Sequence, residues 1–283
     1  MRGRLQAMTV ASTLALLSLL IPPVNIVSLA AMALVTLRRG AYEGLIVLGS
    51  STFFSAILGY VLIGHYQFTL SYLLVLWFPV WLISLVLREG RHLSWAIEIA
   101  ILLGMIGVVG FYSYKPDIAT LWKEMLSAML SDEAPLEAPQ MIEVMSHYMT
   151  GIVAGGSVIS LLLGLFLGRW WQALLYNPCG FSAEFLALQS QRSIALLSVL
   201  LVVFAASSSD LSAEIAWNLS ILAFVMYSII GTATLHSLLA SRQQARYTLY
   251  VLYVTLFLIP HVVFVVALLG LLDPWLNLRK KTL

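Results

Sequence analysis

Long apolar stretches separated by short polar segments run through the whole chain. Six of them approach the length that one helix needs to cross a bilayer, which is about 20 residues at a rise of 1.5 Å per residue. They cover residues 44–64, 68–87, 93–112, 150–168, 193–207 and 213–240. The fifth is the shortest, and its polar end either continues the helix into the interface or caps it. The pattern predicts an all-α, polytopic transmembrane helix bundle with six full crossings.

Two further apolar stretches, residues 8–37 and 247–276, are longer than one crossing needs and contain proline near the middle. Proline breaks a helix because it lacks an amide hydrogen and its ring clashes with the preceding turn. The breaks lie at Pro22, Pro23 and Asn25 in the first stretch and at Pro260 and His261 in the second. Each stretch is either one broken, tilted crossing or two short helices that turn back within the membrane.

The basic residues distinguish these alternatives, because short loops that stay in the cytoplasm carry an excess of Lys and Arg. Counting the crossings in order places one basic group on a single side: Arg38, Arg39, Arg88, Arg91, Arg169, Arg192, Arg242 and Arg246. The mainly acidic loop at 114–147 falls on the other side. Single crossings at the two ends would leave Arg2, Arg4 and the basic residues 279–281 outside. We therefore expect a hairpin at each end and both termini in the cytoplasm.

Composition agrees with a membrane protein, because 61% of the residues are hydrophobic and only 10% are charged, with a mean hydropathy of +0.95. A soluble domain carries roughly 25% charged residues. We expect a single integral membrane domain over residues 1–283, multi-pass in a bacterial inner (plasma) membrane, with the lipid bilayer as its first partner. The net charge of +2 is scattered over the boundaries, so no nucleic-acid partner is expected. The single cysteine, Cys179, excludes an internal disulfide.

Two loops are predicted to contain amphipathic helices. In the extracytoplasmic loop 114–147, apolar residues recur at helical spacing from Ile118 to Leu130, which predicts an amphipathic helix that covers the bundle or closes a ligand cavity. Residues 133–139 after it are typical of a flexible linker. In the cytoplasmic loop 169–192, residues 182–192 predict a second amphipathic helix, whose apolar face needs bilayer, bundle or a partner.

Catalytic signatures of membrane enzymes are missing from the sequence, which has no HExxH, no GxSxG and no paired acids spaced as in a GxGD protease. We therefore expect no enzyme, no catalytic residues and no cofactor. The five histidines form no i, i+4 pair that would clamp a metal on a helix, so no metal site is expected. The small residues Gly151, Gly155, Gly156 and Ser160 predict a face for close helix packing.

Polar residues inside apolar sequence are the candidates for binding a solute, because such groups are costly in a membrane and face protein or water. They are Asn25, Asn218, His236 and His261. Each has a simpler interpretation. Asn25 caps a half-helix or ends a turn, His261 binds a carbonyl freed by Pro260, and Asn218 and His236 join helices by hydrogen bonds. Broken helices near both ends of the chain are nevertheless typical of transporter binding sites.

Two short motifs resemble a known family. Gly180, Phe181, Glu184, Phe185, Leu188 and Arg192 in the cytoplasmic loop, and the end from Gly270 through Asp273 to Arg279, are similar to the YybS-like bacterial membrane proteins. That family, of unknown function, is grouped with the S components of energy-coupling-factor transporters. The resemblance implies a compact helical bundle with a solute pocket open outward, and Ala7, Ala11 and Ala15 as a face toward a transmembrane partner. Taken alone, Asp273 and Arg279 form a local ion pair or bind solute.

Two functions from different classes fit the sequence. The first is a solute-binding or transport protein for an unknown small solute. It would need an ATPase partner or an ion gradient, because the chain has no nucleotide-binding loop. The second is a non-transporting interaction or regulatory protein that docks a partner through its cytoplasmic loop. The candidate interaction residues are Phe181, Glu184, Phe185, Arg192, Asp273 and Arg279.

Overall fold

The computed structural model describes residues 4–129, 137–240 and 245–278. In these residues the regular structure is helical throughout, with one 3₁₀ turn and one π-helical turn and no strand. Five helices are long and apolar enough to span a membrane: Ala41–Leu62, Gln67–Gly90, Leu93–Tyr114, Met149–Tyr176 and Leu211–Ala240. A sixth span is reached if the bent pair Tyr247–Leu258 and Pro260–Leu276 counts as one. The all-α class with five to six apolar helices is therefore confirmed.

The helix that corresponds to the shortest predicted crossing is α11 (Arg192–Ser207), with 16 residues. At 1.5 Å per residue it measures about 24 Å, which is less than the roughly 30 Å hydrocarbon core. Ser208 ends it in an extended conformation, with its backbone amide donating to the Phe204 carbonyl. The exact number of crossings stays a prediction.

The chain forms two compact units. The first comprises Met1–Ala100 and Ser157–Ala187, and the second comprises Ile101–Gly156 and Leu188–Leu283. The long helices α6 (Leu93–Tyr114) and α9 (Met149–Tyr176) therefore contribute residues to both. The single integral membrane domain stays a prediction.

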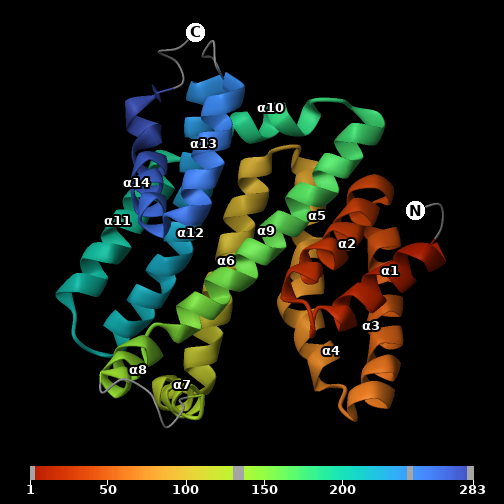
Figure 1. Cartoon of the computed structure of the whole chain (residues 1–283), viewed down its shortest axis with the longest axis horizontal. Helices are drawn as coiled ribbons and strands as arrows, with labels where there is room; N and C mark the ends of the chain where they lie inside the picture. Colours follow the sequence, from red (N-terminus) through yellow and green to blue (C-terminus); the bar gives the residue numbers. More distant parts are fainter. Residues whose placement is uncertain (1–3, 130–136, 241–244, 279–283) are drawn as a thin grey trace. The chain divides into compact units, whose positions relative to one another are not determined.

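The first unit begins with a helical hairpin (Figure 1). Helix α1 (Arg4–Leu17) is followed by the 3₁₀ turn η1 (Pro22–Val24) and by α2 (Asn25–Arg39), which packs against α1. The Ser28 hydroxyl donates to the Ala11 carbonyl across this contact, at 2.8 Å. The first proline-broken stretch thus folds back on itself, as the hairpin interpretation requires.

The alanine face of α1 is used inside the protein. Ala7, Ala11 and Ala15 are buried, and α1 packs against both α2 and α3 (Ala41–Ile63). The expectation that these alanines face a transmembrane partner is therefore wrong for this structure. Small side chains on one helix face allow close approach of any neighbour, and here the neighbours belong to the same chain.

The second long helix of this unit is continuous but irregular. It runs through α4 (Gln67–Tyr72), the π-helical turn η2 (Leu73–Trp77) and α5 (Phe78–Gly90). Pro79 follows the π-helical turn and has no amide hydrogen for the helical ladder, so a local change in helix winding is expected there. Trp77 in that turn is fully buried, and its indole nitrogen donates to the Ser28 hydroxyl at 3.2 Å.

The second unit contains α11, α12 (Leu211–Ala240), α13 (Ala245–Leu258) and α14 (Pro260–Leu276). Helices α12 and α14 lie side by side (Figure 1). Their backbones meet at two glycines, since a Cβ on Gly231 would run into the Val266 carbonyl and one on Gly270 into the Tyr227 carbonyl. The chain bends by 115° between α13 and α14 at the break before Pro260. The second proline-broken stretch therefore also changes direction sharply at its proline.

The two loop helices differ from the sequence interpretation. In the loop 114–147 the predicted amphipathic helix is α7 (Ile118–Ser127), but a second helix, α8 (Ala138–Ser146), begins where a flexible linker was expected. The earlier part of that linker lies outside the described residues. In the other loop the helix is α10 (Gly180–Leu186) and stops before Arg192, so the expected span of 182–192 is wrong. The chain leaves the helix there and buries Leu188 instead.

Candidate functional site

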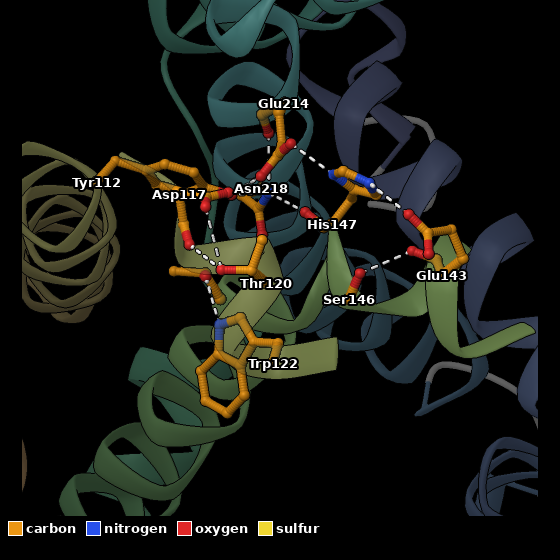
Figure 2. A network of polar contacts seen from close by, with 10 residues as sticks. Tyr112, Asp117, Thr120, Trp122, Glu143, Ser146, His147, Glu214 and Asn218 are labelled. Carbon is orange, nitrogen blue, oxygen red and sulfur yellow. Dashed lines mark hydrogen bonds and ion pairs between the residues drawn. The ribbon is translucent and has the colours of Figure 1, made fainter. Parts of the chain in front are cut away.

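Four segments of the second unit meet in a network of polar and ionisable side chains (Figure 2). Tyr112 lies near the end of α6, and Glu143 lies in α8. His147 follows α8 directly, and Glu214 and Asn218 lie one turn apart near the start of α12. The network therefore lies at the ends of two apolar helices of membrane-spanning length, α6 and α12.

Glu214 is the central acid of the network. Its side chain is 18% exposed, and both carboxylate oxygens have partners. The Tyr112 hydroxyl donates to Oε1 at 2.7 Å, and His147 Nδ1 lies 2.6 Å from Oε2. A carboxylate removed from water is stable only when it is paired in this way. The arrangement therefore holds an ionisable acid between apolar helices at the cost of fixing Tyr112 and His147.

Asn218 forms hydrogen bonds with backbone groups near Glu214. Its side chain is fully buried, and its Oδ1 accepts from the Gly151 amide at 2.5 Å. Its Nδ2 lies within hydrogen-bond distance of the His147 carbonyl at 2.7 Å, the Glu214 carbonyl at 2.8 Å and the Tyr112 hydroxyl at 3.1 Å. Gly151 allows this approach because a Cβ there would collide with the Asn218 backbone. The predicted small-residue packing face is thus confirmed at Gly151.

The network reaches water through His147. The His147 side chain is 45% exposed, and its Nε2 lies 4.0 Å from Glu143 Oε1. Glu143 in turn forms an ion pair with Lys123 of α7. The hydrogen bond from Lys123 holds the pKa of Glu143 below its usual value. Acids and bases therefore alternate from Lys123 through Glu143 and His147 to Glu214. Within the described part of the chain, no three His, Cys, Asp or Glu side chains come together as a metal site.

A pocket of about 410 Å³ lies among α11, α12 and α14 of the same unit. Its wall is mainly aliphatic and aromatic, and the rings of Phe224 and Phe264 contribute to it with centroids 4.8 Å apart. Ser198, Ser220 and Tyr227 also line the pocket, but almost none of the exposed wall is polar. Ser198 and Tyr227 share a hydrogen bond of 3.0 Å. The volume and the small number of polar groups are typical of a small-molecule site.

The structure does not bring the four predicted solute-binding residues together. Asn25 begins α2 in the first unit, with its amide 3.4 Å from the Ser160 hydroxyl. Asn218 and His236 lie on the same helix, but about five turns, or roughly 27 Å, separate them. His236 Nδ1 lies 2.7 Å from the Tyr253 hydroxyl, which joins α12 to α13. His261 is exposed at the start of α14. None of the four lines the pocket of α11, α12 and α14.

The predicted interaction residues separate into two groups. In the first unit the rings of Phe181 and Phe185 lie 5.8 Å and 6.0 Å from that of Phe166, and Glu184 forms a two-pronged ion pair with Arg169. The aromatic face of α10 is thus packed within its own unit. In the second unit Arg192 Nε donates to the Pro274 carbonyl at 3.0 Å, next to the fully buried Asp273. Arg279 lies outside the described residues.

Tyr112, His147 and Glu214 are the site residues that sequence interpretation missed. One signal was present, because Glu214 and Asn218 are spaced i, i+4 and therefore share a helix face. Tyr112 and His147 lie at the two ends of the long loop between α6 and α9, and nothing in their local sequence indicates that they approach Glu214.

Comparison with known proteins adds no family to this picture. No family model, curated protein or solved structure matches the chain. The resemblance to YybS-like proteins therefore stays a prediction.

Proposed function

We propose that the protein is a multi-pass membrane protein that binds a small, mainly apolar solute, as a transporter or as the solute-binding subunit of one. The observation that carries the proposal is the pocket of about 410 Å³ among α11, α12 and α14. Its apolar wall fits the body of such a solute. The pocket wall exposes almost no polar surface, so apolar contacts would hold such a solute.

The Glu214 network supports the same proposal. Ser220 lies two residues after Asn218 on α12, so the pocket and the network are close along the helix axis but lie on different faces of α12. Ionisable groups in membrane-spanning segments are costly and commonly lie on solute or proton pathways. We place the charged or proton-exchanging step of solute handling at Glu214, where His147 connects the acid to water.

The proposal is tested by native mass spectrometry of the protein extracted in mild detergent. We expect a small molecule to be released from the wild-type protein. Val202→Trp should abolish this, because Val202 lines the pocket and an indole there fills it. Leu200→Trp is the matched control, since Leu200 lies on the same helix, is 61% exposed and does not line the pocket.

Two results would contradict the proposal. One is that Val202→Trp and Leu200→Trp retain the same small molecule to the same extent. The other is that bulk phospholipid is the only species released, in which case the pocket is a lipid-filled groove. A co-purified protein with no small molecule would instead favour the interaction function, for which the packed aromatic face of α10 offers no support.

A further inference from the structure

The first unit contains a second cavity of different character, with a volume of about 490 Å³. It lies where α2, α5 and α9 end, and α10 contributes one side. Its lining is rich in polar groups and includes three guanidinium groups, those of Arg88, Arg91 and Arg169. The carboxylates of Glu89 and Glu184 and the side chains of Gln172, Tyr176 and Asn177 complete the polar wall. This cavity shares no residue with the proposed solute pocket.

Two of the three guanidinium groups have structural partners. Arg169 is 12% exposed and donates from Nε and NH2 to the two oxygens of Glu184, at 2.9 Å and 2.5 Å. Its charge is therefore balanced. Arg88 NH1 donates to the Leu37 carbonyl at 2.8 Å, and the Gln172 amide approaches the same oxygen at 3.4 Å. These donors neutralise the negative end of α2, which would otherwise disfavour an anion in the cavity.

Arg91 supplies the surplus positive charge. Among the described residues it makes no ion pair, and its side chain is exposed at the cavity. Glu89 offsets little of the charge, because it is 71% exposed and reaches only Arg88, at 3.4 Å. The Arg38 guanidinium lies 4.9 Å from the ring centroid of Tyr176, one of the lining residues, but Arg38 itself does not line the cavity.

The backbone of Arg91 is also unusual. It has φ of +54° and ends α5 in the left-handed conformation, a position that glycine fills without strain. The Cβ of an arginine is strained at this positive φ. Substitution of Arg91 by glycine therefore removes the guanidinium group and relieves the backbone strain at the same time.

We propose that this cavity binds a phosphate group, carried either by the headgroup of an anionic phospholipid or by a soluble phosphate ester. Guanidinium groups bind phosphate oxygens in pairs, and the amides of Gln172 and Asn177 and the Tyr176 hydroxyl offer neutral donors beside them. Basic pockets between helices on the cytoplasmic side of membrane proteins bind such headgroups. The cavity lies among the basic residues that predict the cytoplasmic side of this chain.

The test uses Arg91→Gly in the full-length protein. Binding is measured by thermal unfolding in detergent and by native mass spectrometry, with phosphatidylglycerol, phosphatidylcholine or inorganic phosphate added. Phosphatidylglycerol should stabilise the wild-type protein and remain bound, whereas phosphatidylcholine should not. Arg91→Gly should weaken the effect about tenfold, the size expected for one charge-assisted contact. Lys115→Gln removes one charge from the outside loop and is the matched control.

Each outcome decides the proposal. Stabilisation by inorganic phosphate but not by phosphatidylglycerol, lost in Arg91→Gly, supports the phosphate site and assigns it to a soluble ligand. The proposal is overturned if neither phosphatidylglycerol nor inorganic phosphate stabilises the protein, or if Arg91→Gly and Lys115→Gln weaken binding equally. Because glycine relieves the positive φ at this position, Arg91→Gly should fold at least as well as the wild type. A loss of binding would therefore not reflect unfolding.

Discussion

At the scale of single residues, Asn218 joins segments that lie far apart in the sequence. Its amide bonds the Gly151 amide and the His147 carbonyl at the entry to α9, and it also contacts the Tyr112 hydroxyl at the end of α6. These partners are backbone groups or are themselves bound to Glu214. A single buried side chain thus fixes the geometry around the acid.

We predict that Asn218→Leu lowers stability by about 1–3 kcal/mol, because it leaves buried partners without hydrogen bonds. Thermal unfolding in detergent measures this change. Ser220→Ala is the control, since its hydroxyl donates to the Ala216 carbonyl of its own helix, and a change within about 0.5 kcal/mol is expected. Equal unfolding midpoints for Asn218→Leu and the wild type would show that the network does not hold α6, α9 and α12.

Glu143 gives the network a dependence on pH. Lys123 lowers its pKa below the usual 4.5, so the ion pair stabilises the contact between α7 and α8 at neutral pH. That stabilisation is present above the ordinary pKa and is lost as the pH falls through the lowered one. Hydrogen exchange in α7 and α8 should therefore increase in acid. The increase should be smaller in Lys123→Gln, and a wild-type contact insensitive to acid would contradict this role for Glu143.

Only part of the site could be predicted from the sequence. Asn218 could be identified because an amide in an apolar helix is conspicuous. Its partners could not, because Tyr112 and His147 lie beside a long loop whose path depends on tertiary packing. The same limit applies to Arg91, whose positive φ follows from the end of α5 and is not visible in the sequence.

At the scale of elements, glycines decide which helices approach closely. Gly231 and Gly270 bring the backbones of α12 and α14 together, and these two helices form much of the wall of the solute pocket. On α9, Gly155 fits against Ile221 and Val225, whereas no atom lies within 4 Å of the position that a methyl group on Gly156 would take. Glycines in neighbouring positions thus have different roles.

We predict opposite effects for two glycine substitutions. Gly231→Ala forces its methyl group into the Val266 carbonyl and should destabilise the protein by about 1–3 kcal/mol or prevent folding. The methyl group added by Gly156→Ala would have no other atom within 4 Å. This substitution should stabilise α9 by up to about 1 kcal/mol, because alanine has a higher helix propensity than glycine. Thermal unfolding of the two variants side by side measures the difference. A Gly231→Ala variant as stable as the wild type would contradict the close packing of α12 against α14.

Elements were more predictable than residues. Apolar length and proline positions located the long helices and both breaks, since bilayer thickness and the missing proline donor act locally. Helix α8 and the early end of α10 were missed because short helices depend on contacts that periodicity does not show. The alanine face of α1 was identified correctly as a packing face and assigned to the wrong neighbour.

At the scale of the whole molecule, the central claim is that the chain spans a membrane with its basic loops inside and its acidic loop outside. Between α7 and the loop after α9, the described residues contain one helix of spanning length, Met149–Tyr176. Ser127 at the end of α7 and Cys179 after α9 should therefore lie on opposite sides.

The single native cysteine makes this claim directly measurable, because Cys179 is exposed. Intact cells are treated with a membrane-impermeant maleimide, with or without permeabilisation. We predict that Cys179 reacts only after permeabilisation. Ser127→Cys in a Cys179→Ser background should react in intact cells. Labelling of Cys179 in intact cells would contradict the account. So would a result in which both positions react only after permeabilisation.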